Sequence, residues 1–253
     1  MLEVQKVQEN PYFHVLLTLS THNPFLINNV AHYEQLFDQR IASLELLPTQ
    51  KKWALENRTQ LVSVLNLDEA MAQFFKEYKK RPDFANTIFI ITGDHAMPEI
   101  PMQSKIDRYH VPLLIYSPLL KEAKTFHNFV SHFDIAPSVL AYYRENFALK
   151  TPTQVTWIGQ GLDKGASAKG EGIAMMQSKN QLIDFVRGNY HLSEGQLYQL
   201  DGTLNEDMAP DNAKEELSKR FELFKRKNKL FYTQKRLLPD SVYVNYFRPL
   251  KKD

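Results

Sequence analysis

The chain has 253 residues, of which 43% are apolar and 24% are charged, and it contains no cysteine. This composition excludes a disordered chain, a disulfide scaffold, thiolate metal ligands and an encoded cysteine nucleophile. The net charge is only +2, yet residues 213–253 carry 12 Lys/Arg against 5 Asp/Glu. A basic segment can bind nucleic acid, but its regular apolar face favours a solvated amphipathic helix, so we expect no nucleic-acid partner.

The first predicted element is a short, nearly continuous apolar run at residues 13–20, which is typical of a buried strand. Pro24 ends this element, because proline restricts the residues before it to turn or extended geometry. Residues 26–47 are predicted to form a loop followed by a helix, which Pro48 closes.

Between residues 59 and 80, apolar residues recur at three- and four-residue spacing, which predicts an amphipathic helix. Asp68 falls in the middle of this apolar stripe, where a lone carboxylate is costly to bury. We interpret Asp68 as a hydrogen-bonded core residue rather than a catalytic one. The stripe comprises Leu61, Val64, Leu65, Met71, Ala72, Phe75 and Tyr78.

Two further apolar runs, at residues 87–92 and 110–116, predict buried strands, with Pro112 near a strand start or at a sheet edge. Asp134 then opens a helix as its N-cap, and Pro137 falls in the first turn, where proline is tolerated. Nearly all-apolar strands that alternate with helices predict a mostly parallel sheet covered by helices on both faces.

The second part of the chain has a different pattern. Residues 157–171 are rich in Gly, Ser and Lys and predict a loop, and residues 214–229 predict a closing helix. Four short strands separated by turn residues predict an antiparallel meander between them, at residues 173–177, 182–187, 190–192 and 196–200. We therefore expect an α/β domain at 1–150 and a small antiparallel-sheet subdomain, with a closing helix and a basic tail, at 151–253.

Gly93, Asp94 and His95 directly follow the predicted strand at 87–92. Ligands bind beyond the carboxyl ends of strands in parallel sheets, and glycine lets the backbone turn or approach a ligand closely. An imidazole nitrogen and a carboxylate oxygen suit zinc or manganese, and carboxylates also suit calcium and magnesium. The triplet is a candidate metal site, although a turn without function also explains it when it is considered alone.

Histidines supply the other candidates. His22 follows the predicted strand at 13–20, and there it could donate to an anionic oxygen or act as an acid or base. His132 precedes the helix that Asp134 opens and is the second candidate for the same pocket. A surface-turn histidine and a helix-capping histidine, respectively, are the alternatives. His110 and His127 are interpreted as structural.

A complete catalytic apparatus is not evident in the sequence. A metal site needs three or more protein ligands, and covalent transfer of a phosphoryl or sulfuryl group needs an activated nucleophile. No Ser or Thr lies in a nucleophile motif, and the chain has no Gly-x-Ser-x-Gly elbow, no Gly-rich phosphate loop and no His-Glu-x-x-His.

The order of these segments resembles the C-terminal half of the sulfatase family, within the alkaline phosphatase superfamily, and most of all its lipoteichoic-acid-synthase branch of phosphoglycerol transferases. The later stretch at 195–207 resembles the closing strand of the small C-terminal sheet in sulfatases. The other matching stretches are 17–25 (Leu-Thr-Leu-Ser-Thr-His-Asn-Pro-Phe), 65–75, 86–95 (Asn-Thr-Ile-Phe-Ile-Ile-Thr-Gly-Asp-His), 111–118 and 131–138, where Ser138 replaces the usual Thr.

This resemblance implies an alkaline-phosphatase-like sandwich in which Asp94 and His95 bind a divalent metal ion (Mn, Ca, Mg or Zn). It implies that His22 contacts the phosphate or sulfate group of an ester substrate. The acidic ligand and the nucleophile of the family lie upstream of these motifs, so we expect no catalytic residue in this chain.

The same resemblance predicts that the chain is a piece of a longer protein, with the missing N-terminal part as its partner. That protein would be a membrane-anchored bacterial enzyme of the cell envelope, and this chain a soluble part of its extracytoplasmic domain. No run of residues approaches the ~20 apolar residues of a membrane span, and no signal peptide is visible.

The predicted function is thus that of a fragment of a metal-dependent sulfatase-like hydrolase of sulfate or phosphate esters. The alternative is a phosphoglycerol or phosphoethanolamine transferase. A non-catalytic interaction module with a basic tail, and a complete metallophosphatase of another family, are hypotheses of different classes. Turnover of a phosphodiester by this chain alone would distinguish the last of these.

Overall fold

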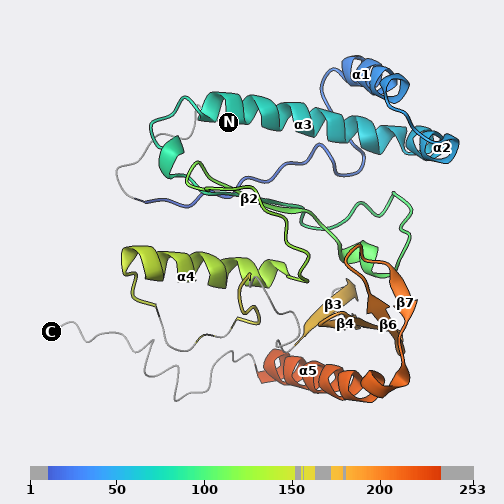
Figure 1. Cartoon of the computed structure of the whole chain (residues 1–253), viewed down its shortest axis with the longest axis vertical. Coiled ribbons are helices and arrows are strands. Elements are labelled where there is room, and N and C mark those ends of the chain that lie inside the picture. The colour runs from blue at the N-terminus through green and yellow to red at the C-terminus, as the bar shows by residue number, and fades with distance from the viewer. Residues whose placement is uncertain (1–10, 152–154, 156, 163–171, 179–180, 235–253) are drawn as a thin grey trace. The chain divides into compact units, whose positions relative to one another are not determined.

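The computed structural model describes residues 11–151, 155, 157–162, 172–178 and 181–234 (Figure 1). The chain divides into two compact units. The first comprises Met1–Gln103 with Asp107–Ala123, and the second comprises Ser104–Ile106 with Lys124–Asp253. The predicted boundary at residue 150 stays a prediction, and most of the loop predicted at 157–171 lies outside the described residues.

The helices of the first unit are α1 (Val30–Ser43), α2 (Pro48–Glu56) and α3 (Arg58–Tyr78), and they bury Phe37, Ala54 and Val62 together (Figure 1). The predicted helices within 26–47 and 59–80 are therefore confirmed. The prediction that Pro48 closes a helix is wrong. Pro48 begins α2, because the first turn of a helix leaves its N–H groups unused and proline lacks one.

Asp68 does not lie in the core. Its side chain is exposed on α3, so the predicted core hydrogen bond is wrong. Val62 and Tyr78 are buried, whereas Val64 of the predicted stripe is 41% exposed. Apolar residues occur on more than one face of α3, and the packing of α1 selects the face that carries Val62.

The first unit also contains a two-stranded sheet of β1 (Phe89–Thr92) and β2 (Leu113–Tyr116), at two of the predicted strand positions. The two strands pair antiparallel, with Phe89 opposite Tyr116 and Thr92 opposite Leu113. The described residues are therefore mixed α/β, but their strands do not form the mostly parallel sheet that was predicted.

Residues 13–20 are not a buried strand in this structure. Phe13, Val15 and Leu17 are 82%, 78% and 70% exposed, and no strand pairs with this run among the described residues. An apolar run becomes a buried strand only where neighbouring strands take up its backbone hydrogen bonds and other elements cover its faces. The local sequence pattern does not supply those neighbours, which explains the error.

An aromatic cluster fixes β1 against α3. The ring of Phe89 lies 4.9 Å from that of Phe75 and 5.0 Å from that of Tyr78, both at steep angles. Tyr116 of β2 lies 5.7 Å from Phe75. Edge-to-face pairs of this kind each contribute about 0.5–1.5 kcal/mol beyond the burial of their area. The strand whose end carries Gly93 is thus held by several side chains.

The segment after α3 is held by a partly buried ion pair. Arg81 Nη2 lies 2.8 Å from Asp83 Oδ2, and Tyr12 donates a hydrogen bond to the same carboxylate. Hydrogen bonds from Arg81 and then from Tyr12 lower the pKa of Asp83 from 3.8 to about 2. These bonds tie the start of the described chain to the end of α3.

We expect Asp83→Asn to lower the free energy of unfolding by about 2 kcal/mol at pH 7. The folded-state pKa of Asp83 lies below its unfolded value, so this contribution is complete above about pH 4 and is lost as the pH falls towards 2. Urea unfolding of both proteins at several pH values is the measurement. A difference that persists undiminished at pH 2 would contradict the assignment.

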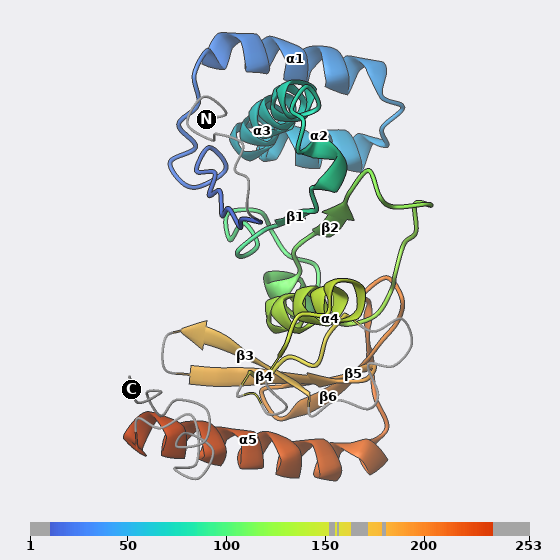
Figure 2. The same cartoon turned by 90° about the vertical axis from the view of Figure 1, so that its left-hand side faces the viewer.

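The second unit contains α4 (Ile135–Phe147), a five-stranded sheet and α5 (Lys214–Gln234), and the sheet lies between the two helices in Figure 2. Each strand pairs antiparallel with the next, so the predicted meander and closing helix are confirmed, with one additional strand, β7. The strands are β3 (Ile173–Ser178), β4 (Gln181–Arg187), β5 (Tyr190–Ser193), β6 (Gln196–Leu200) and β7 (Glu206–Met208).

Alternation along the strands gives this sheet two different faces. The apolar face packs on α5, and Phe185 stacks on Phe221 with ring centroids 5.2 Å apart. The opposite face carries Asp184 and His191, which are fully buried. The apolar core consists of Phe185, Leu192, Leu197, Ala209, Leu217 and Phe221.

Asp134 opens α4, as predicted, but its side chain accepts hydrogen bonds from backbone groups before and after the helix. Its carboxylate is buried and accepts hydrogen bonds from the backbone N–H groups of Ser131, Gln160 and Gly161, at 2.7, 2.8 and 3.2 Å. These bonds join the chain on either side of α4.

Short 3₁₀ helices occur at Phe84–Asn86, Ile106–Tyr109, His132–Asp134 and Asp211–Ala213.

The outer face of α5 is solvated, as predicted for the basic segment. Lys219 pairs with Glu215 and Arg220 pairs with Glu216, each one helical turn apart. Residues 235–253 of the predicted basic tail lie outside the described residues.

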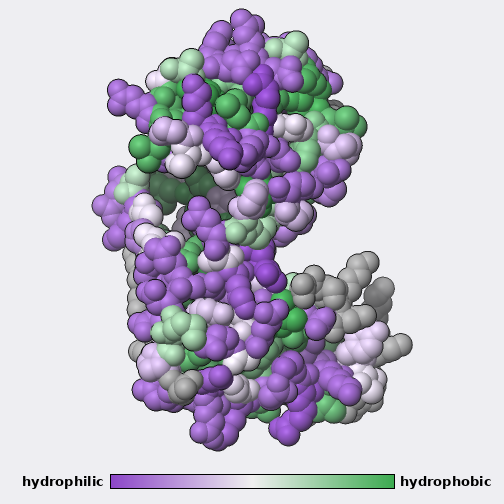
Figure 3. All heavy atoms as spheres, turned by 90° about the vertical axis from the view of Figure 1, so that its right-hand side faces the viewer, coloured by the Kyte–Doolittle hydropathy of each residue, from purple (hydrophilic) through white to green (hydrophobic). Residues whose placement is uncertain are grey.

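Hydrophilic residues cover much of the visible surface in Figure 3, with apolar side chains among them. In the part of the chain that the structure describes, no helix is long and apolar enough to cross a membrane.

Candidate metal site

The candidate site begins where β1 ends. Gly93 follows Thr92, and a Cβ added to Gly93 would lie 3.3 Å from the side chain of Val111. That distance is tighter than ordinary van der Waals contact, so glycine lets the two chain segments approach closely. Asp94 and His95 then leave the strand together, and both side chains are exposed.

His22 and His95 lie close together in the first unit. Their ring centroids lie 6.2 Å apart at an interplanar angle of 76°. They are brought together even though residues 13–20 form no strand. The turn at Thr21–Pro24 is closed by hydrogen bonds from the N–H of His22 to Leu19 and from the N–H of Phe25 to His22.

The two imidazoles make equivalent local hydrogen bonds. Nδ1 of His22 lies 2.7 Å from the carbonyl oxygen of Asn23, and Nδ1 of His95 lies 2.7 Å from that of Ala96. A carbonyl oxygen only accepts, so Nδ1 carries the proton in both rings. In the neutral ring Nε2 then bears the lone pair, which is the arrangement of a histidine prepared to bind a metal ion.

Asp94 lies beside His95, and its side chain is exposed to solvent. Its Oδ1 accepts the backbone N–H of His95 at 3.1 Å, and its Oδ2 lies 3.8 Å from His95 Nε2. The two side chains are 75% and 56% exposed, so both can rotate towards a shared ligand. A carboxylate oxygen and an imidazole nitrogen bind zinc at about 2.0–2.2 Å.

The side chains of Asp94 and His95 are of the types that bind a divalent ion, but they are too few to form a complete metal site. The residues that the structure describes contain no group of three or more His, Asp or Glu side chains arranged around one ion. A structural metal site has about four ligands and a catalytic one about three plus an open position. Asp94 and His95 alone are therefore too few to form either kind of site.

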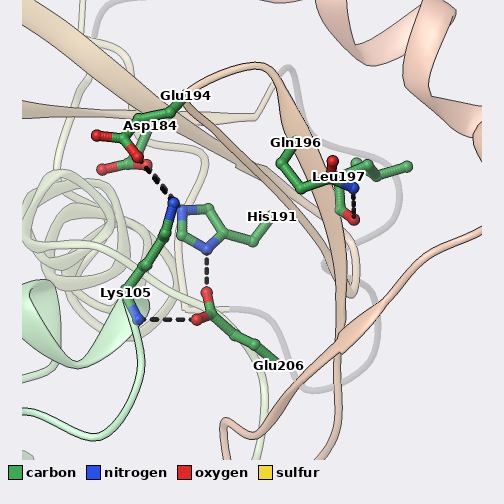
Figure 4. Close-up of polar contacts among 7 residues, drawn as sticks. All are labelled: Lys105, Asp184, His191, Glu194, Gln196, Leu197 and Glu206. Atoms are coloured by element: carbon green, nitrogen blue, oxygen red, sulfur yellow. Dashed lines mark hydrogen bonds and ion pairs between the residues drawn. The ribbon is translucent and has the colours of Figure 1, made fainter.

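His132 lies in the second unit, in the 3₁₀ turn before α4, and its side chain is exposed. Its place beside the other candidates stays a prediction. The sequence reasoning missed a different histidine, His191, which contacts Asp184 and Glu206 (Figure 4). The signal was available, because Asp184 interrupts the otherwise apolar run of β4 between Ile183 and Phe185.

Comparison with known proteins supports one family. The sulfatase family model matches residues 1–143, which include His22, Asp94 and His95. Lipoteichoic acid synthase 1 of Bacillus subtilis (strain 168) is 30% identical over 147 residues, which is 52% of this chain and 21% of that protein. The chain thus spans about a fifth of the length of this curated relative. No solved structure matches the chain significantly.

Proposed function

The chain belongs to the sulfatase family, and on that premise we propose that Asp94 and His95 are two ligands of a divalent metal ion in an enzyme that cleaves or transfers phosphate or sulfate esters. The observation that carries this proposal is the convergence of His22 with His95 at the end of β1, 6.2 Å apart, beside an exposed carboxylate. This geometry supports the assignment of Asp94 and His95, which the family resemblance also implies.

Each side chain has a defined part. His95 offers the lone pair of Nε2, because Nδ1–H is held by the carbonyl of Ala96. Asp94 offers Oδ2, while its Oδ1 is held by a backbone N–H. A divalent ion bound here supplies charge that lowers the proton affinity of a nucleophile and stabilises negative ester oxygens.

His22 is proposed to bind the phosphate or sulfate group rather than the metal. When its ring is protonated, Nε2–H becomes a charge-assisted donor to an anionic oxygen, while Nδ1–H stays on the carbonyl of Asn23. The ring is exposed, so a substrate can reach it. The short turn at Thr21–Pro24 fixes its position without help from a packed core.

The nucleophile and the remaining metal ligands are proposed to come from outside the described residues, in a larger protein of the cell envelope. The similarity to lipoteichoic acid synthase 1 favours transfer of a phosphoglycerol-type group over hydrolysis of a sulfate ester. The missing half of the predicted sheet, with its parallel strands, would belong to the same larger domain.

We expect this chain with Mn²⁺ to show no turnover of bis-p-nitrophenyl phosphate or p-nitrophenyl sulfate above the rate of Mn²⁺ in buffer. Two ligands without an activated nucleophile cannot perform covalent transfer. The absorbance of released p-nitrophenol is the measurement. Turnover that is lost in Asp94→Ala would instead identify a complete metallophosphatase. It would contradict the proposal that the nucleophile and the remaining metal ligands come from outside the described residues.

A further inference from the structure

The helix α5 is longer than the sheet face that it covers. Its apolar contacts with the sheet are made by Leu217 and Phe221, which are buried in the first half of the helix. Every side chain from 226 to 233 is exposed, and the C-terminal end of α5 extends beyond the strands in Figure 2. Residues 226–233, which we call the distal segment, are therefore not covered by another element in the described part of the chain.

The charges of α5 are distributed unevenly along the helix. Residues 214–225 carry four Lys/Arg against three Glu, and three of these cations pair with a glutamate of the same helix. The distal segment carries Arg226, Lys227 and Lys229 and has no acidic residue. Among the described residues, no carboxylate forms an ion pair with these three cations. Positive charge that is not compensated in this way attracts an anionic surface.

Apolar side chains occur among these cations. Leu230, Phe231 and Tyr232 are 51%, 41% and 81% exposed. Leu230 and Phe231 follow Leu223 and Phe224 by seven residues, so these four side chains share one face of the helix. An apolar face therefore continues into the distal segment, where its side chains are exposed to solvent.

Cations and apolar side chains are neighbours on the distal segment. Arg226 and Lys227 lie one helical turn before Leu230, and Lys227 also lies one turn before Phe231. The long stems of Lys and Arg let their charged heads reach lipid phosphates while an adjacent apolar side chain enters the edge of the acyl region.

This combination favours a lipid surface over a nucleic acid. Helices that lie in the headgroup region of an anionic bilayer present cations beside exposed aliphatic and aromatic side chains. A nucleic acid uses cations for its phosphates and aromatic rings for its bases, and neither contact requires an exposed leucine. Leu230 therefore points to the bilayer.

We propose that the distal segment of α5 binds the surface of an anionic lipid bilayer. Leu230 and Phe231 then lie at the boundary between headgroups and acyl chains, and the three cations contact lipid phosphates. The first half of α5 is anchored on the sheet, so the segment meets the bilayer as a helix that has already formed. This surface contains none of the residues assigned to the metal site, so it can be tested separately.

Co-sedimentation of the full 253-residue chain with vesicles is the test. We expect binding to vesicles of about one third phosphatidylglycerol in phosphatidylcholine, and no binding to phosphatidylcholine alone. Added salt should weaken this binding, because it screens exposed charges. Absence of binding to the phosphatidylglycerol vesicles, or equal binding to both compositions, would overturn the proposal.

A pair of charge variants locates the surface. Arg226→Gln with Lys229→Gln should lower the vesicle affinity on the order of 25-fold, since each cation near an anionic surface contributes roughly fivefold. Lys219→Gln with Arg220→Gln is the matched control, because it removes the same charge from ion-paired residues in the first half of the helix. The control should change the affinity less than about threefold. Equal losses in the two double variants would contradict the assignment to the distal segment.

An apolar variant distinguishes a bilayer from other anionic partners. Leu230→Ser with Phe231→Ser keeps every charge and should lower the vesicle affinity on the order of tenfold, because two apolar side chains no longer enter the bilayer boundary. Both side chains are exposed, so the fold should persist, and circular dichroism checks that it does. Unchanged affinity in this variant would show that the segment binds polyanions such as nucleic acid through charge alone, and would overturn the proposal.

Discussion

Replacing both Asp94 and His95 by alanine is expected to weaken Mn²⁺ binding by this chain at least about tenfold, since loss even of an outer-shell partner costs about 10–100-fold in metal affinity. The reason is geometric: the two side chains follow one strand end, and Nε2 and Oδ2 lie 3.8 Å apart. The concentration of free Mn²⁺, followed by electron paramagnetic resonance during a titration, is the measurement.

A matched control comes from an equally exposed carboxylate and imidazole in the same unit. Asp68 on α3 and His32 on α1 are both exposed, and both lie on helices rather than at the end of β1. Asp68→Ala with His32→Ala should leave Mn²⁺ binding unchanged. Equal losses in the two double variants would show that the ion binds to surface charge in general.

Phe185→Ala is expected to destabilise the chain by about 3–5 kcal/mol, the range for removing a buried aromatic ring from a packed core. Phe185 is 0% exposed, and it stacks on Phe221 of α5. A Cβ at Gly172 would lie 2.3 Å from the Phe185 ring, which shows how closely the backbone approaches it. The alanine variant would leave a cavity between the sheet and α5.

Urea unfolding followed by circular dichroism measures this effect. Tyr232 near the end of α5 is the control, because it is 81% exposed and Tyr232→Ala should change the free energy of unfolding by less than about 0.5 kcal/mol. A loss below about 1 kcal/mol for Phe185→Ala would contradict the core described for the second unit.

The predictable parts of the fold are those in which local pattern and tertiary packing agree. The antiparallel meander and α5 follow from closely spaced strands and from Leu217 and Phe221 at helical spacing. The strand ending at Thr92 was predicted because its apolar run indicates a buried strand and the glycine after it indicates where that strand ends.

The errors occur where a distant partner decides the outcome. The run at 13–20 has the composition of a buried strand, yet no described strand pairs with it. Pro48 was taken as the end of a helix, although proline also suits a helix start, which is where α2 uses it. Asp68 was assigned to the wrong face, because α1 selects among the apolar faces of α3.

The membership of the candidate site stays a prediction, and its hydrogen bonds could not be predicted from the sequence. Strand ends and residue types indicated His22, Asp94 and His95. The sequence could not indicate that both rings use Nδ1 on a neighbouring carbonyl and leave Nε2 available. Asp184 within the apolar run of β4 was a signal, but it did not point to His191, because Asp184 and Glu206 lie 7 and 15 residues from that histidine and strand register brings them together.

The most direct test of the central claim is the position of Mn²⁺ on this chain. Bound Mn²⁺ broadens the nuclear magnetic resonance signals of the nuclei around it. At substoichiometric Mn²⁺ we predict the strongest broadening at the His95 ring and the Asp94 carboxylate, and weaker broadening at His22. Broadening that is strongest elsewhere, or equal at all exposed carboxylates, would contradict the assignment of Asp94 and His95 as metal ligands.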